Sequence, residues 1–453
     1  MKGITYSTIV LFLFLLAGCS KSSGEQDLVY INLLSVKLDG ASVNTEVENI
    51  SITPVLRLTF SQTIDAQNFK DKVTIAPANA VKGISYQFFN SNSVIDISLE
   101  LEYDTSYSIK ITGPIGIQGE TLKEGFALTF STQQDEIIYA KPPCTNVNDC
   151  NFNTVIGNAT GEGDFEFYAN YDIYEDKAVW RDLEKAIIVI HGASVNADDY
   201  FSYLSSSLED LNLSEKTVLI SPLFKKEPNS SSDLYWNSLG YRDGKTSNGT
   251  VQVSSFEVLD NIIDRLADKA HFPALNEIVI TGQSSGGRFT HTFAAANRSE
   301  SRHTDLQFEY VVSESQYFYY PTNERINEQT NTLFLPANCS GINFWPFGFE
   351  AVPAYVGALD KETFNAQFIS RNITYLLGNG NGSDSSLNTS DCEANLLGSS
   401  RYIRGENMFQ YMGEKFGTSH GHKKIIAQGV AHDGFKIYTS PEFKALITDL
   451  FKD

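Results

Sequence analysis

The segment Thr281–Gly287 constrains the fold of this chain more than any other segment. It reads Thr-Gly-Gln-Ser-Ser-Gly-Gly and contains the pattern Gly-x-Ser-x-Gly, centred on Ser284. An apolar run, Glu277–Ile280, precedes it, and a helix-like stretch, Arg288–Ala296, follows it. Strand, sharp turn and helix in this order form a nucleophile elbow, where glycines leave room that a Cβ would fill. The pattern predicts that Ser284 is a nucleophile at the carboxyl end of a parallel sheet.

A second match to the same pattern occurs at Gly417–Gly421, around Ser419. It follows a helix-like stretch, residues 408–416, and precedes a predicted strand, residues 424–427. This order is the reverse of the order in an elbow. The flanking sequence therefore favours Ser284 over Ser419.

Strand and helix patterns divide the chain into two regions. Residues 164–453 alternate short apolar strands with amphipathic stretches, which predicts an α/β fold with a mostly parallel sheet and flanking helices. Its predicted strands are 186–190, 218–220, 278–280, 310–312, 373–377 and 425–426. Residues 28–133 alternate apolar and polar residues between turns, which is typical of an all-β sandwich. The strands predicted there are 55–60, 94–99, 107–111 and 127–130, and residues 134–163 are predicted to be a linker.

The N-terminus has the pattern of a secretory signal. A basic start and a short apolar run lead to Leu16-Ala17-Gly18-Cys19, which resembles a bacterial lipobox. The resemblance implies that residues 1–18 are removed, that Cys19 carries a lipid, and that residues 19–27 are a polar tether. The expected location is the bacterial cell envelope, with a lipid anchor in the outer membrane and the protein on its periplasmic face or at the cell surface.

Removal of the lipidated cysteine leaves Cys144, Cys150, Cys339 and Cys392. An even number of cysteines in an exported protein predicts two disulfides, for which three pairings are possible. Cys144 with Cys150 and Cys339 with Cys392 is one of them. The net charge of −21 argues against a nucleic-acid partner, because phosphate binding needs a basic surface.

A serine hydroxyl needs a base, an acid that orients the base, and an oxyanion hole. The candidate base is His432, which follows the last predicted strand in a loop with glycines on both sides. The candidate oxyanion loop is His191-Gly192-Ala193-Ser194, where the amide of Ala193 would act together with the amide of Ser285.

With these residues in place, the region from about residue 164 resembles the α/β-hydrolase superfamily, whose order is serine, acid, histidine. It is similar to exported bacterial hydrolases with a His-Gly oxyanion strand, a Tyr-Trp-Asn segment (Tyr235–Asn237) and a Gly-x-Ser-x-Gly-Gly elbow. The resemblance implies an esterase or lipase, with peptidases and polyester hydrolases as relatives. Residues 28–133 resemble a bacterial Ig-like domain, through Pro54–Ser61 and Tyr103–Tyr107.

The superfamily places its acid after the seventh strand, and here this sequence departs from the pattern. Asn381 stands where relatives tend to have an aspartate, and an amide cannot stabilise an imidazolium. The first carboxylate in this loop is Asp384, which is the predicted acid, and Asp391 is the second choice.

Residues 314–370 are rich in aromatic residues and are predicted to form a cap over the site, with most of the rings packed inside it. His420 and His422 have no third ligand at a suitable spacing, so neither a metal nor another cofactor is expected.

The leading hypothesis is therefore an exported, lipid-anchored serine hydrolase that cleaves small or polymeric carboxylic esters through an acyl-enzyme at Ser284. One alternative is a binding or adhesion lipoprotein with an inactive hydrolase fold, which Asn381 motivates. Another alternative is a peptidase or polymer depolymerase that uses the same triad.

Overall fold

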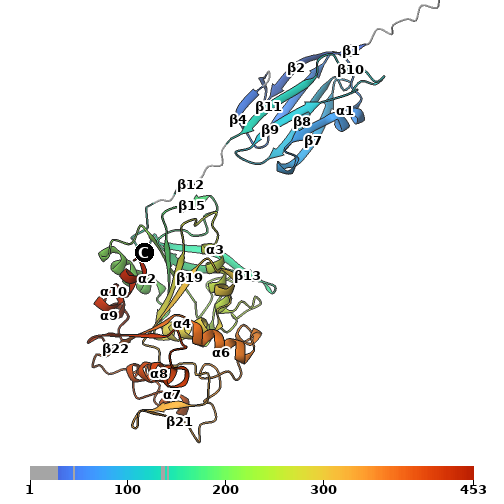
Figure 1. Cartoon of the computed structure of the whole chain (residues 1–453). Helices are drawn as coiled ribbons and strands as arrows, with labels where there is room; N and C mark the ends of the chain where they lie inside the picture. Colours follow the sequence, from blue (N-terminus) through green and yellow to red (C-terminus); the bar gives the residue numbers. More distant parts are fainter. Residues whose placement is uncertain (1–28, 44–45, 134–137, 140–141, 453) are drawn as a thin grey trace, which may run out of the picture. The chain divides into compact units, whose positions relative to one another are not determined.

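The computed structural model describes residues 29–43, 46–133, 138–139 and 142–452. The chain forms two compact units, Met1–Glu136 and Ile137–Asp453 (Figure 1). Cys19, the signal segment and the tether lie outside the described residues. No helix in the described part of the chain is both long enough and apolar enough to cross a membrane.

The first unit is built from two sheets around one core. One sheet has the order β4-β11-β9-β6 and the other has the order β3-β2-β5-β8-β7. Leu56 and Ile97 from one sheet and Ile109 and Leu128 from the other are buried in the same apolar cluster. The strands are β2 (Leu33–Leu38), β3 (Ala41–Ser42), β4 (Glu46–Ile50), β5 (Val55–Phe60), β6 (Val73–Ala76), β7 (Val81–Phe89), β8 (Val94–Leu101), β9 (Ser106–Ile111) and β11 (Phe126–Thr132). The four strands predicted from the sequence are among them.

Short elements complete this unit. A pair of two-residue strands, β1 (Tyr30–Ile31) and β10 (Thr121–Leu122), runs in parallel, and helix α1 (Ala66–Lys72) and the 3-10 turn η1 (Ala78–Ala80) lie near β6. Asp65 caps α1 by accepting hydrogen bonds from the amides of Gln67 and Asn68.

The second unit is an α/β structure with an eight-stranded sheet in the order β13-β14-β17-β16-β18-β19-β22-β23. β14 is antiparallel to both of its neighbours, and the six strands from β17 to β23 run parallel. The strands are β13 (Asn151–Asn158), β14 (Gly161–Ala169), β16 (Lys185–Ile190), β17 (Thr217–Pro222), β18 (Glu277–Gln283), β19 (Gln307–Ser313), β22 (Ile373–Gly378) and β23 (Lys423–Ala427). The α/β class with flanking helices is thus confirmed.

Successive residues of the central strands pack into different cores because side chains alternate across a sheet. In β16, Ile188 belongs to one apolar cluster and Ile187 and Val189 to the other. Helices α3, α4, α6 and α8 pack in the first cluster and α2 and α10 in the second, on opposite faces of the sheet in Figure 1. The helices are α2 (Ala197–Asp210), α3 (Ser255–Leu266), α4 (Ser285–Ala296), α5 (Ser299–Arg302), α6 (Lys361–Ser370), α7 (Cys392–Asn395), α8 (Arg401–Phe416), α9 (Gly434–Tyr438) and α10 (Pro441–Leu450).

The predicted linker, residues 134–163, is wrong over its second half. β13 and the start of β14 lie in that range and pair along eight residues, from Asn151 with Tyr168 to Asn158 with Gly161. β13 is the edge strand, and Ile156 is the one residue in it that is fully buried. An edge strand needs little apolar sequence, so its Asn-rich run resembled a loop.

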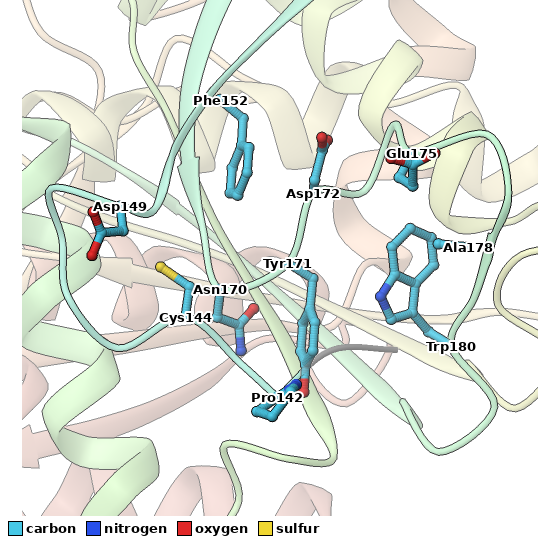
Figure 2. Close-up of a pocket in the computed structure, with 10 residues that line it drawn as sticks. All are labelled: Pro142, Cys144, Asp149, Phe152, Asn170, Tyr171, Asp172, Glu175, Ala178 and Trp180. Atoms are coloured by element: carbon cyan, nitrogen blue, oxygen red, sulfur yellow. The ribbon is translucent and has the colours of Figure 1, made fainter. Parts of the chain in front are cut away.

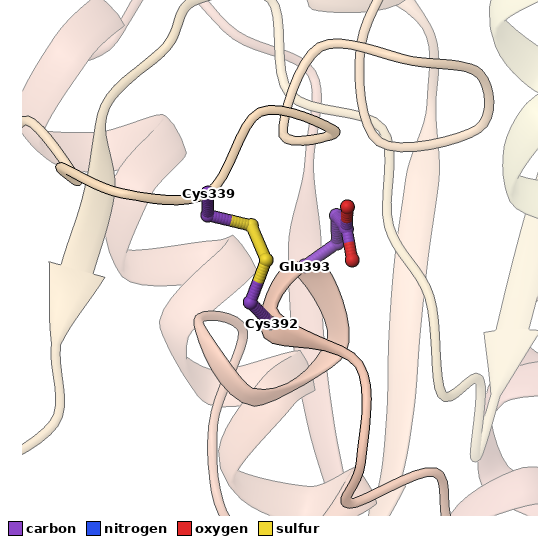
Figure 3. A group of neighbouring side chains, drawn as sticks. All are labelled: Cys339, Cys392 and Glu393. Carbon is purple, nitrogen blue, oxygen red and sulfur yellow. A yellow bond between two sulfur atoms is a disulfide. The ribbon is translucent and has the colours of Figure 1, made fainter.

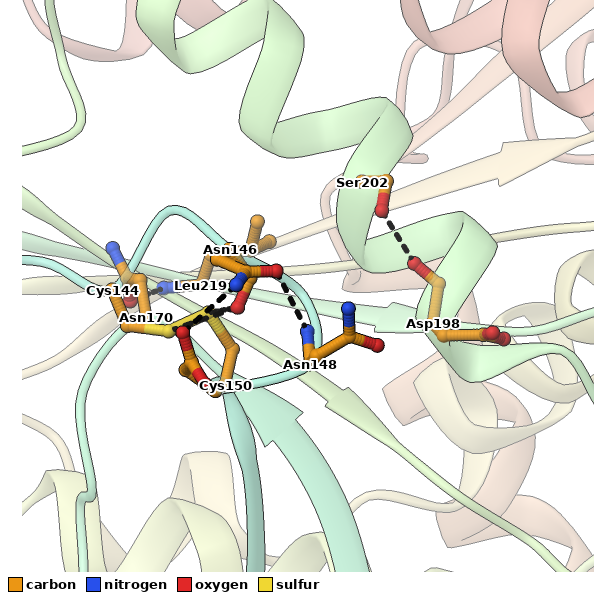
Figure 4. The surroundings of a disulfide bond; sticks show 9 residues. Cys144, Asn146, Asn148, Cys150, Asn170, Asp198, Ser202 and Leu219 are labelled. Carbon is orange, nitrogen blue, oxygen red and sulfur yellow. Dashed lines mark hydrogen bonds between the residues drawn. A yellow bond between two sulfur atoms is a disulfide. The ribbon is translucent and has the colours of Figure 1, made fainter.

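Two disulfides of the second unit join Cys144 to Cys150 and Cys339 to Cys392, which is the first residue of α7. The Cys144–Cys150 loop is attached to the sheet through Asn170, as Figure 4 shows. The Cys144 amide donates to the Asn170 carbonyl, and the Asn170 side chain accepts from the Leu219 amide. The disulfide therefore closes the segment that leads into β13.

Residues 314–370 lie between β19 and β22 and hold a two-stranded hairpin, β20 (Arg325–Asn327) with β21 (Thr332–Phe334), a 3-10 turn η3 (Val356–Ala358), and α6. Most of its aromatic rings pack inside the larger core, and Phe344 is exposed. The interpretation of these rings as interior packing fits most of the segment.

Candidate active site

Ser284 occupies the turn between β18 and α4. Its backbone has a φ of 61° and a ψ of −115°, a region that residues with a Cβ rarely adopt. Its amide donates a hydrogen bond to the carbonyl of Ser313 at the end of the neighbouring strand β19, at 3.1 Å. A strained backbone of this kind is characteristic of functional turns. The predicted strand, turn and helix are all present.

The glycines around Ser284 are required by close backbone contacts. A Cβ on Gly282 would overlap the backbone of Gly286, and a Cβ on Gly286 would overlap the carbonyl of Ile190 in β16. A Cβ on Gly287 would overlap the carbonyl of Ser313. All three positions would bring a Cβ well under 3.0 Å from backbone atoms, which cannot move aside. The elbow is therefore held by the strands on both sides of β18.

The predicted oxyanion loop follows β16 and is fixed through its carbonyl groups. Tyr241 donates hydrogen bonds to the carbonyls of His191 and Gly192, at 3.1 and 2.9 Å. The amide of Ala193 has no acceptor among the described residues, and Ser285 is the first residue of α4, so its amide has no acceptor within the helix. Both amides are thus available as donors, as the predicted oxyanion hole requires.

His432 lies in the loop between β23 and α9, beside the elbow. Its Nδ1 accepts a hydrogen bond from Nε2 of Gln283, the residue before Ser284, at 2.8 Å. Oε1 of Gln283 accepts in turn from the hydroxyl of Tyr200, at 2.6 Å. Burial, and then the charge of Arg401, lower the pKa of His432 to about 4. The imidazole is therefore neutral at pH 7, as a general base must be.

A carboxylate that the sequence analysis did not select, that of Glu314, lies close to the same histidine. Its Oε2 is 3.9 Å from Nδ1 of His432, and its Oε1 accepts from the amide of Gly378 at 2.7 Å. Glu314 directly follows β19 and has a φ of 48°. Burial raises its pKa to about 7.

Glu314 was missed because the search for an acid was restricted to the loop after β22. A signal was present in the sequence, since a carboxylate directly after a buried parallel strand reaches the carboxyl edge of the sheet. Ser313 pairs with Gln283 in the parallel register, which places Glu314 next to the elbow.

Asp384, the acid predicted from the sequence, does not bond to His432. Its carboxylate accepts from Nε of Arg401 at 2.5 Å and from the amide and hydroxyl of Ser386, at 3.0 and 2.6 Å. Burial disfavours its charged form, but the bonds from Ser386 and Arg401 outweigh burial and lower its pKa to about 2. Asp384 is therefore an ionised partner of Arg401, close enough for its charge to raise the pKa of His432.

The other two candidates also point elsewhere. Asn381 is exposed, and Asp391 is the exposed residue before α7, where its carboxylate accepts from the Asn388 side chain. The glycines of this loop are packed against the histidine loop, since the Gly380 amide donates to the Val430 carbonyl. These contacts hold the loop that carries Asp384 against the loop that carries His432.

Arg401 connects the loops that carry the two carboxylates. It donates to Asp384 and, through Nη1, to the backbone carbonyl of Glu314 at 3.0 Å. A cavity of about 340 Å³ borders both carboxylates, Arg401 and His432. His432 therefore borders a cavity that charged side chains line.

The remaining histidines of the predicted motifs have structural partners. His191 accepts from the Phe224 amide through Nε2, and His422 bonds the Phe368 carbonyl and the Tyr375 hydroxyl. One group in the described part of the chain, Cys339, Cys392 and Glu393, has the spacing of metal ligands. Figure 3 shows its two sulfurs joined in a disulfide, so they are not thiolate ligands.

A second cavity, of about 320 Å³, is lined by residues outside this site (Figure 2). It lies between the Cys144–Cys150 loop and the turn after β14. Its walls combine aromatic rings with carboxylates: Phe152, Tyr171, Trp180, Asp149, Asp172 and Glu175.

No protein-family model matches this chain, and no curated protein matches it in sequence. Among solved structures, it is similar to a poly(3-hydroxybutyrate) depolymerase of Bordetella parapertussis, with 16% identity and a TM-score of 0.47 over 67% of this chain and 91% of that one. It is also similar to poly(aspartic acid) hydrolase-1 of Sphingomonas sp. KT-1, with 19% identity and a TM-score of 0.44 over 66% and 96%. A third similar structure is an S-formylglutathione hydrolase of Agrobacterium tumefaciens, with 12% identity and a TM-score of 0.37 over 66% of this chain and 93% of that one.

Proposed function

We propose that this protein is a serine hydrolase of the α/β-hydrolase superfamily that cleaves carboxylic esters. The observation that carries the proposal is the elbow itself. Ser284 has a positive φ between β18 and α4, and the residue before it is hydrogen-bonded to His432. With Glu314 as the acid, serine, acid and histidine occur in the chain order of this superfamily.

In the proposed reaction, Ser284 Oγ attacks the ester carbonyl and Nε2 of His432 takes the hydroxyl proton. The developing oxyanion is stabilised by the amides of Ala193 and Ser285. The protonated histidine then gives its proton to the leaving alcohol, and water releases the acyl group by the same path in reverse.

A neutral imidazole carries one proton, so Nε2 of His432 can accept the serine proton only when that proton is on Nδ1. An acceptor must therefore face Nδ1, and Glu314 is the nearest carboxylate to it. We propose Glu314, in place of Asp384, as the residue that holds this tautomer and stabilises the imidazolium. A separation of 3.9 Å is longer than a hydrogen bond, and such contacts often shorten only when substrate binds.

A half-turn of the Gln283 amide would also present an acceptor, Oε1, to Nδ1. The turned amide keeps its bond to Tyr200, because a tyrosine hydroxyl can accept as well as donate. Gln283 is therefore proposed to position the imidazole, while Glu314 supplies the negative charge.

The test is covalent labelling by a fluorophosphonate probe. The full chain should be labelled at one site, and Ser284→Ala should abolish labelling, while Ser419→Ala serves as the matched control and should keep it. A folded protein that is not labelled, and that turns over no 4-nitrophenyl ester, would favour the alternative of a binding lipoprotein. Comparing ester, amide and polyester substrates separates an esterase from a peptidase or a depolymerase.

We also propose that the protein is exported and anchored by a lipid on Cys19, and that residues 28–133 form an Ig-like spacer. The signal-like sequence of residues 1–19 and the two disulfides of the second unit support export. Cys19→Ala should release the protein from the membrane fraction of a bacterial host. Unchanged membrane association would contradict the anchor.

A further inference from the structure

Arg242 is a half-buried arginine that has no ion-pair partner among the described residues. Its Nε is buried without a hydrogen-bond acceptor, and within the described residues its side chain has no ion pair or ring contact. Three other arginines have a buried Nε of this kind, and each has another partner. Arg288 pairs with Asp243, Arg371 pairs with Glu300, and Arg298 stacks on the ring of Tyr355.

The residues on both sides of Arg242 are fixed to the catalytic elements. Tyr241 donates to the carbonyl of Gly192, the residue before the oxyanion donor Ala193. Asp243 pairs with Arg288, whose amide donates to the carbonyl of Ser284. Arg242 therefore lies between the oxyanion loop and the first turn of α4.

Arg242 and Arg288 carry two positive charges in this region, and Asp243 supplies one negative charge. Burial lowers the pKa of Arg288, and the charge of Asp243 raises it. The charge of Arg242 also lowers the pKa of Arg288, so the two guanidinium groups are neighbours. One carboxylate of this segment, Asp243, lies 2.5 Å from Arg288, and no carboxylate among the described residues is paired with Arg242. In a chain with a net charge of −21, an arginine that has no ion pair within the described residues, in the segment bonded to the oxyanion loop, calls for an anion.

We propose that Arg242 binds a carboxylate on the substrate, so that the preferred ester carries an anionic group in its acyl or alcohol part. A guanidinium matches a carboxylate in planar, bidentate geometry. A single uncompensated charge suits a singly charged carboxylate better than a doubly charged phosphate. This inference rests on the proposed ester hydrolysis at Ser284 and names its substrate class.

The experiment compares two chromogenic esters with the same six-carbon acyl chain, 4-nitrophenyl hexanoate and the 4-nitrophenyl monoester of hexanedioic acid. The wild-type protein should prefer the anionic ester. Arg242→Gln should lower kcat/KM for that ester by roughly tenfold to a hundredfold and leave the neutral ester within about twofold, because only one substrate loses a charge-assisted bond. Arg242→Lys should keep part of the preference.

Arg298→Gln is the matched control, because it also removes a half-buried arginine with an unpaired Nε, and it should not change the preference. Equal losses on both esters in Arg242→Gln, or a wild type without preference, would overturn the inference. A second readout does not depend on turnover. Hexanedioate should raise the melting temperature of Ser284→Ala but not of Ser284→Ala/Arg242→Gln, and no difference between them would also overturn it.

Failure of the proposed function has a different signature. In that case neither ester would be cleaved and the fluorophosphonate probe would not label Ser284. The binding of hexanedioate would still show whether the anion site at Arg242 exists.

Discussion

Oε2 of Glu314 lies 3.9 Å from Nδ1 of His432, while the carboxylate of Asp384 is bonded to Arg401. The two carboxylates border the same cavity, but their environments separate their chemistry. Burial raises the pKa of Glu314 to about 7, and the bonds that Asp384 accepts lower its pKa to about 2. The carboxylate beside the histidine is thus the one without a cationic side chain bonded to it.

The first prediction separates the two candidate acids. Glu314→Gln should lower kcat by about 10³–10⁴, because replacing the acid of a triad by its amide costs about 10⁴ in turnover. Asp384→Asn should lower kcat by roughly tenfold or less, through a shift of Arg401. Steady-state kinetics on 4-nitrophenyl butyrate measure both variants. If Asp384→Asn is the more damaging change, the acid is Asp384 as the sequence alone predicted.

The second prediction concerns stability and pH. Glu314 has a folded pKa of about 7, above the value of 4.5 for an unperturbed glutamate. A raised pKa stabilises the fold at low pH, and this stabilisation is lost as pH rises from about 4.5 through 7. Glu314→Gln does not titrate, so its melting temperature should exceed that of the wild type at pH 8.

The size of this effect follows from the shift in pKa, which corresponds to about 3 kcal/mol. The difference in melting temperature between variant and wild type should therefore shrink as pH is lowered toward 4.5. Thermal unfolding of the full chain from pH 5 to pH 8 provides the measurement. A difference that does not change with pH would show that the pKa of Glu314 is not raised.

The third prediction concerns Gln283, which connects His432 to Tyr200. Gln283→Leu removes both hydrogen bonds and should lower kcat roughly tenfold to a hundredfold with little change in KM, because the imidazole loses its orientation. Tyr200→Phe removes only the outer bond and should have a smaller effect. An unchanged kcat in Gln283→Leu would show that Glu314 alone orients the imidazole.

The fourth prediction compares two glycine-to-alanine changes in helices. Gly286→Ala brings a Cβ into the carbonyl of Ile190 and should prevent stable folding of the second unit. Gly413 is in α8 and has no atom within 4 Å of the position of a Cβ, so Gly413→Ala should stabilise the protein by about 0.5–1 kcal/mol. Circular dichroism and thermal melts distinguish these outcomes. A soluble Gly286→Ala protein with wild-type stability would contradict the tight elbow.

The central strands could be predicted from sequence because they are buried on both faces. β16 and β22 are almost wholly buried and consist mainly of apolar residues, as strands covered on both faces require. β13 could not be predicted in this way. As a partly buried edge strand it needs few apolar residues, so nothing local distinguished it from a linker.

The signals for the candidate nucleophile and the candidate base were also local in sequence. Ser284 is marked by the glycines on both sides of it, and His432 by its place after the last strand. The acid was not local, because carboxylates are common and the choice among them depends on which loop ends next to the histidine. The position of the loop after the seventh strand pointed to Asp384 as the acid. In the structure Asp384 is bonded to Arg401, and Glu314 is the carboxylate that lies near His432.

By itself the sequence determined the α/β sheet of the second unit, the elbow at Ser284 and the loop that carries His432, because periodicity and glycine placement act over a few residues. Tertiary structure alone decided which carboxylate lies near His432, that Gln283 bonds its Nδ1, and that Arg242 has no ion pair within the part of the chain that is described. These properties depend on distances between segments that are far apart in the chain. Burial and neighbouring charges then set the protonation of each group, and neither can be calculated before the chain is folded.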